Sequence, residues 1–208
     1  MLPEVMINRY AAVAAPVGGL LLGVLDFVWI KYVPFPFGGL GNSLAVWAVA
    51  GFLCTYWSRW GWARGVSAAV VMLVVAVPSY YLAAMVIQHD DAANVYSSVA
   101  LMWMGFAVIA GVVFGGAGIV ARTPGRWRTA AQAMPAAVMF AEAALVSRWI
   151  GADGRGLEPL WAALLDVALG VLLTVLVAAT WRQRLIALLL AVPLGVVGFG
   201  LMSAARFG

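Results

Sequence analysis

Hydrophobic residues fill seven long blocks of the chain, with short polar segments between them. The blocks cover residues 11–33, 40–57, 66–88, 95–121, 130–150, 158–180 and 185–205, and the second is the shortest. Each has at least about 18 residues, enough for a helix to cross about 30 Å of hydrocarbon. The blocks show no alternation of period two, which a membrane-spanning barrel would require, so helices must satisfy their backbone polar groups. The pattern predicts an all-α polytopic membrane protein of about seven transmembrane helices.

The composition supports the same class. Hydrophobic residues make up 65% of the 208 residues and charged residues 10%, and the mean hydropathy is +1.03. A soluble domain is about 45–50% apolar and about 25% charged. Residues 1–10 lack the basic start of a cleavable signal peptide, so we expect the first helix to remain. The sequence predicts one transmembrane domain over residues 1–208, placed in the cell membrane.

The charges between the blocks predict the orientation of the chain. Eight of the twelve basic residues fall on one side: Arg9, Arg59, Arg64, Arg122, Arg126, Arg128, Arg182 and Arg184. The positive-inside rule places this side in the cytoplasm, with the N-terminus, and puts the C-terminus outside. The basic balance therefore indicates topology rather than binding of nucleic acid.

Several absences exclude whole classes of chemistry. The chain has one cysteine, Cys54, and one histidine, His89, so a thiolate or multi-histidine metal site within one chain is not expected. It has no Walker loop, GxGxxG turn or GxSxG elbow. We expect neither a metal nor a cofactor.

Three acidic residues inside the predicted helices are the main candidates for chemistry. Asp26, Glu142 and Asp166 lie in the first, fifth and sixth blocks. At about 1.5 Å per residue, each lies about 10–12 Å from the outer end of its helix. A charge at this depth costs at least about 2.5 kcal/mol, so such residues usually face the protein interior. We predict one shared site; the alternative is a purely structural role, with each acid hydrogen-bonded between helices or paired with Lys31 or Arg148.

Aromatic and polar residues at a similar depth are candidates for a substrate pocket. They are Trp29, Tyr80, Tyr81 and Trp103, with Asn42 at the start of the second helix and Trp161 nearby. Trp and Tyr also gather at membrane interfaces, and we assign Trp127, Trp181 and other tryptophans near helix ends to that role. For the deeper rings, lining a pocket and packing in the core remain alternatives.

Two other patterns favour structural roles. Asp90 and Asp91 follow the third block and are reminiscent of a diphosphate–metal motif, but no second acidic cluster accompanies them, so we predict a solvated loop. Gly19 with Gly23 and Gly111 with Gly115 have the spacing that lets helices approach closely in lipid. We expect these glycines to pack helices within the bundle; the alternative is a contact between two copies of the chain.

A resemblance to a known group of proteins covers most of the chain. The runs GGLLLG at 18–23, NSLAVWAVAGF at 42–52, GVVFGGAGIVAR at 111–122 and AEAAL at 141–145 resemble a family of small actinobacterial multi-pass membrane proteins of unknown function. The resemblance implies the fold and draws attention to Glu142, and it supplies no activity.

Two classes of function fit these residues. The first is a membrane-embedded enzyme that uses buried carboxylic acids on a lipophilic, isoprenoid-like substrate, as in proton-initiated cyclisation. Aromatic faces would stabilise the cation, and the chain is similar in size and residue inventory to small integral-membrane terpene cyclases. The second is a transporter or substrate-binding membrane subunit in which the same acids bind a cation or proton. We favour the enzyme at this point, with a lipophilic small molecule and the lipid bilayer as partners.

Overall fold

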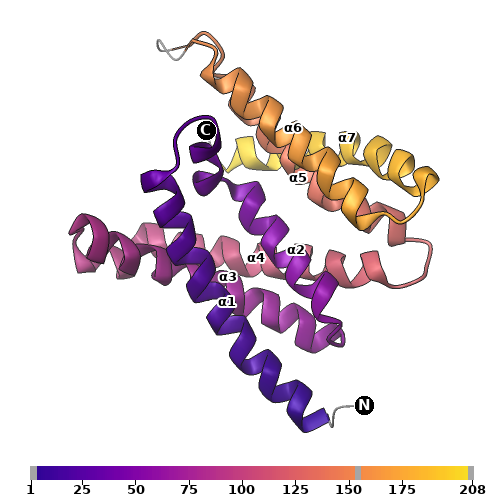
Figure 1. The fold of residues 1–208 in the computed structure, drawn as a ribbon, viewed down its shortest axis with the longest axis horizontal. Helices are drawn as coiled ribbons and strands as arrows, with labels where there is room; N and C mark the ends of the chain where they lie inside the picture. The colour runs from indigo at the N-terminus through magenta and orange to yellow at the C-terminus, as the bar shows by residue number, and fades with distance from the viewer. Residues whose placement is uncertain (1–3, 153–155, 206–208) are drawn as a thin grey trace. The chain divides into compact units, whose positions relative to one another are not determined.

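The computed structural model describes residues 4–152 and 156–205, and all seven predicted blocks form α-helices (Figure 1). They are α1 (Glu4–Tyr32), α2 (Leu44–Ser58), α3 (Trp62–Gln88), α4 (Ser98–Arg122), α5 (Arg128–Ser147), α6 (Glu158–Val177) and α7 (Trp181–Ala204). Two short 3₁₀ helices, η1 (Phe37–Asn42) and η2 (Ala92–Tyr96), precede α2 and α4. The all-α prediction is confirmed.

Two helices begin later than their hydrophobic blocks. The block at 40–57 starts within a glycine-rich segment, and η1 occupies that segment before α2 begins at Leu44. The block at 95–121 starts within η2, and α4 begins at Ser98. The hydroxyl of Ser97 accepts a hydrogen bond from the backbone N–H of Ala100 at 3.1 Å, which caps α4 at its first turn. Glycine flexibility and serine capping therefore set boundaries that hydrophobicity alone does not show.

Six of the helices are long and apolar enough to cross a membrane. The exception is α2, whose 15 residues span only about 22 Å. The protein is therefore a multi-pass membrane protein, and its shortest predicted span is also the shortest helix. Prolines occur inside α1, α3, α5 and α7, and each helix continues through its proline.

The chain forms two compact units. The first contains residues 1–33 and 50–119, and the second contains residues 34–49 and 120–208. The helix α2 begins in the second unit and ends in the first. The expectation of a single domain over residues 1–208 stays a prediction.

In the first unit, α1 packs closely against α3. A side chain added at Gly19 would meet the carbonyl oxygen of Met72, and one at Gly23 would meet that of Ala76. The glycines therefore let two helix backbones approach, as their spacing predicts. Gly111 makes a comparable contact between α4 and Val70 of α3.

In the second unit, α5 packs against both α6 and α7 and is the most buried of the long helices. Small residues form its contact with α7, where Ala133, Ala136 and Ala137 pack with Ala187 and Ala191. On α6, Gly170 lies against the ring of Phe140. This arrangement places the polar residues of α5 among other helices rather than in lipid.

Candidate functional site: a buried carboxyl pair in the second unit

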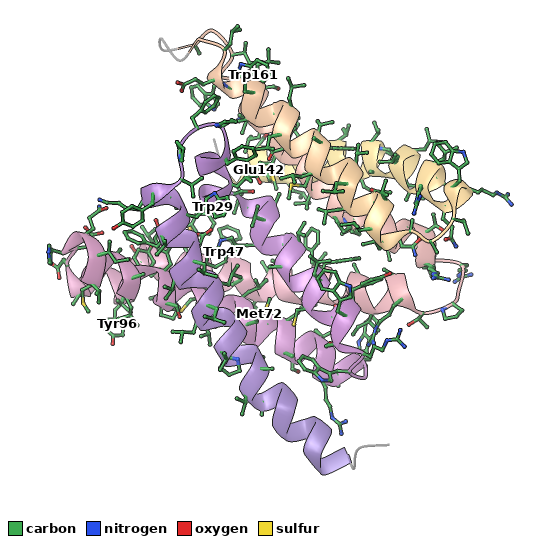
Figure 2. The ribbon with its side chains drawn as sticks, in the orientation of Figure 1. Trp29, Trp47, Met72, Tyr96, Glu142 and Trp161 are labelled. Carbon is green, nitrogen blue, oxygen red and sulfur yellow. The ribbon has the colours of Figure 1, made fainter. Side chains whose placement is uncertain are left out.

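Glu142 of α5 binds the beginning of α2 (Figure 2). Its Oε2 atom accepts a hydrogen bond from the hydroxyl of Ser43 at 2.9 Å and another from the backbone N–H of Ala45 at 2.6 Å. The first N–H groups of a helix have no partner within the helix, and they carry partial positive charge. A carboxyl group from α5 thus satisfies a donor that the short helix α2 leaves open.

Ser43 connects this carboxyl group to the helix cap. Its extended backbone ends η1, and its hydroxyl oxygen also accepts a hydrogen bond from the N–H of Val46 at 3.1 Å. Serine is among the best residues for this position because its side chain can reach the third N–H of the helix. The Ser43 hydroxyl therefore accepts from the helix and donates to Glu142, so the two interactions share one side chain.

Asp166 of α6 is the neighbour of Glu142, and the two carboxyl groups are close enough to interact electrostatically. Both are buried, with 9% of Glu142 and 5% of Asp166 exposed. No described residue forms a hydrogen bond with Asp166. The structure therefore brings together two of the three predicted acids, one held firmly and one free of hydrogen-bonding partners in the described part of the chain.

Asp26 belongs to the first unit, where it is buried on α1. Its carboxyl group interacts electrostatically with Tyr80 of α3. The ring of Tyr80 packs edge-on against Phe27 at 5.4 Å and against Tyr81 at 5.5 Å between ring centroids. Asp26 thus lies beside an aromatic cluster of Phe27, Tyr80 and Tyr81, and its proximity to the carboxyl pair stays a prediction.

The other predicted pocket residues occupy varied surroundings. Trp29 is 41% exposed and Trp161 is 56% exposed, so each presents much of its ring to the outside of the described structure. Trp103 is half-buried and packs edge-on against Phe106 at 6.0 Å. The side chain of Asn42 lies outside the described residues. Their roles in binding a substrate stay predictions.

The charged residues considered as alternative partners of the acids make other contacts. Lys31 donates a hydrogen bond to the side-chain oxygen of Gln88 at 3.0 Å. Arg148 places its guanidinium group 5.6 Å from the ring centroid of Phe199.

Asp91 is exposed and accepts a hydrogen bond from the N–H of Ala93 at 2.9 Å, which caps η2. This is the structural turn expected of a solvated loop.

Metal binding has no support in the residues that the structure describes. Within residues 4–152 and 156–205, no group of three or more His, Cys, Asp or Glu side chains is close enough to hold an ion. In the second unit, the carboxyl groups of Glu142 and Asp166 interact with each other electrostatically.

Sequence reasoning missed two polar contacts. The sequence points to Asn42 at the start of the second helix, whereas in the structure the neighbouring Ser43 binds Glu142. The second contact is made by Gln132 of α5, which is fully buried and donates a hydrogen bond to the carbonyl of Ala121 at 3.2 Å. A serine directly before an apolar run is a recognisable capping signal, but nothing in the sequence indicates which carboxyl group binds it.

Comparison with known proteins places the chain in a family without an assigned activity. The profile of a family of unknown function, DUF6518, matches residues 3–206, so the chain belongs to this family. No curated protein and no solved structure matches significantly. Membership of an uncharacterised family is thereby confirmed, and the actinobacterial origin and the likeness to terpene cyclases stay predictions.

Proposed function

We propose that this protein is a proton-coupled transporter of the cell membrane, with Glu142 and Asp166 as its proton-binding site. The observation that carries the proposal is the proximity of two buried carboxyl groups on neighbouring membrane helices. Two nearby negative charges are costly where water is scarce, so such a pair tends to keep one of its carboxyl groups protonated. Intramembrane acids that take up and release protons are typical of pumps and transporters.

The contact with α2 gives proton exchange a structural consequence. When Glu142 is ionised, its negative charge lies at the positive end of α2 and accepts bonds from Ser43 and Ala45. When the pair takes up a second proton, this attraction weakens. The ionised and the protonated state therefore favour different positions of α2. Coupled transport requires such a difference between the two states. In this scheme Asp166 holds the first proton, because it has no competing hydrogen bond to a described residue, and the second proton reaches Glu142.

Infrared spectroscopy tests the proton site directly. The purified protein is titrated from acidic to alkaline pH while the C=O band of protonated carboxyl groups is recorded. We expect one band to disappear on deprotonation, and to be missing or shifted in Asp166→Asn and Glu142→Gln. The matched control is Glu158→Gln, which removes an exposed acid at the start of α6. A band that both site variants leave unchanged contradicts the proposal.

Transport is tested in vesicles that contain the purified protein and a pH-sensitive dye. A panel of cationic, anionic and neutral solutes is offered under an imposed pH gradient. We expect one solute class to accumulate with movement of protons, and Asp166→Asn to abolish the coupling while Glu158→Gln keeps it. If the infrared band is present but no solute moves, the pair binds protons for another purpose and the transport proposal is wrong.

Acid catalysis on a lipophilic substrate is the second candidate, and the surroundings of Asp26 favour it. A protonated Asp26 would donate its proton to an alkene carbon of an isoprenoid chain, and a proton lost from the resulting carbocation would restore the acid. The rings of Phe27, Tyr80 and Tyr81 beside it offer π faces that stabilise a cation. Asp26→Asn would then lower turnover by about 10²-fold or more. Chromatography and NMR of prenylated substrates distinguish this outcome, because cyclisation leaves the mass unchanged.

A further inference from the structure

Two arginines in the second unit are held in the same way at the same kind of helix end. The Nε atom of Arg128, at the start of α5, donates to the carbonyl of Ala121 near the end of α4 at 3.3 Å. The Nε atom of Arg184, in the first turn of α7, donates to the carbonyl of Ala178 after the end of α6 at 3.0 Å. Each bond satisfies a carbonyl that the preceding helix leaves open. Each guanidinium group is thereby fixed through Nε, with no described residue bonded to its terminal nitrogens.

The packing of α5 against α7 places these two arginines at one level. A Cβ atom added at Gly195 would lie 3.2 Å from the carbonyl oxygen of Ala137. One added at Gly198 would lie 3.1 Å from the Cβ atom of Ala141. Arg128 precedes the α5 residues of these contacts by about three turns, and Arg184 precedes the α7 residues by about three turns. The two arginines therefore lie at a similar level along the two helices. Figure 1 shows the loops before α5 and before α7 at the same end of the unit.

This end of the second unit is strongly basic and carries exposed tryptophans. Its arginines are Arg122, Arg126, Arg128, Arg182 and Arg184, and residues 120–131 and 177–187 contain no acidic residue. Trp127 is 62% exposed and Trp181 is 71% exposed. Tryptophan at the end of a membrane helix marks the level of lipid headgroups. The fixed arginines therefore lie where headgroup phosphates are found.

We propose that Arg128 and Arg184 bind the phosphate of an anionic phospholipid between the starts of α5 and α7. A guanidinium group presents its terminal N–H donors in a planar fork that suits phosphate oxygens. The bond through Nε fixes the direction of the fork in advance, so less conformational entropy is lost on binding. The positive charge of the surrounding arginines favours an anionic lipid over a zwitterionic one.

Native mass spectrometry of the whole protein, released from micelles containing phosphatidylglycerol or phosphatidylcholine, tests this site. We expect the native protein to retain phosphatidylglycerol preferentially. The double variant Arg128→Gln with Arg184→Gln should bind it at least about tenfold more weakly, because charge-assisted hydrogen bonds are lost. The matched control is Arg64→Gln, which removes an exposed arginine of α3 in the first unit.

Three results overturn the proposal. They are undiminished retention of phosphatidylglycerol by the double variant, an equal loss in Arg64→Gln, and no preference over phosphatidylcholine in the native protein. If the double variant does not fold, the effect of salt on lipid retention by the native protein provides the test. About 1 M NaCl must weaken retention of phosphatidylglycerol and leave that of phosphatidylcholine unchanged. Retention of the anionic lipid that salt does not affect contradicts an arginine–phosphate site.

Discussion

Replacing Ser43 by alanine tests the link between Glu142 and α2. The change removes the hydroxyl that donates to Glu142 at 2.9 Å and accepts from the N–H of Val46 at 3.1 Å. Loss of a serine cap costs about 1 kcal/mol, and loss of a hydrogen bond to a charged group costs about 1.5–3 kcal/mol. We therefore expect Ser43→Ala to lower the free energy of unfolding by about 2.5–4 kcal/mol.

Ser97→Ala supplies the matched control. Ser97 caps α4 through the N–H of Ala100 and also donates to a backbone carbonyl, that of Asn94 at 2.8 Å, but it has no bond to a carboxyl group. Its loss should cost about 1 kcal/mol. In a protein of this size 1 kcal/mol lowers the melting temperature by about 2–4 °C, so the expected decreases are about 5–15 °C for Ser43→Ala and about 2–4 °C for Ser97→Ala.

The single cysteine makes the measurement simple. Cys54 lies in α2 and is partly buried, so a fluorogenic maleimide reports unfolding as this thiol becomes accessible. Combining Ser43→Ala with Glu142→Gln should give a total cost clearly smaller than the sum of the single costs, because the two residues share one bond. Equal costs for Ser43→Ala and Ser97→Ala, or additive effects in the double variant, would refute the reasoning.

Two further predictions concern topology and helix packing. Alkaline phosphatase fused after Asp91 should be active and after Arg126 inactive, because the basic loops are predicted to be cytoplasmic; activity at Arg126 overturns the orientation. Gly23→Ala should lower the melting temperature, because its new methyl group meets the carbonyl of Ala76, whereas Gly105→Ala meets no neighbour within 4 Å and should leave it unchanged or raise it. Equal effects of the two glycine variants on the melting temperature would show that close packing of α1 on α3 is unimportant.

The sequence predicts the helices well because lipid imposes a simple rule on them. A helix that crosses the membrane needs a long and mainly apolar run of residues, so the hydrophobic blocks locate α2 to α7 to within about four residues, whereas α1 begins at Glu4 rather than at residue 11. The errors occur where local chemistry intervenes. The glycine-rich segment before Leu44 forms η1, and Ser97 delays the start of α4.

The candidate site is only partly predictable for a geometric reason. Counting residues gives the depth of an acid along its helix, and it predicts one level for Asp26, Glu142 and Asp166. It gives neither the neighbours of the helix nor the direction in which a side chain points. The bond from Ser43 to Glu142 joins residues 99 positions apart, so it depends on packing that no local pattern encodes.

The composition of α5 has a consequence for how the protein is made. This helix is the least apolar of the six candidate membrane spans and the most buried, and it carries Gln132 and Glu142 near its two ends. On its own it is a poor substrate for insertion by the translocon, because polar residues raise the cost of entering lipid. The helices that cover it, α6 and α7, are more apolar and are synthesised later. Stable integration of α5 should therefore depend on the last two helices, so that a nascent chain released after Ser147 would be degraded, whereas one extended through α7 would assemble.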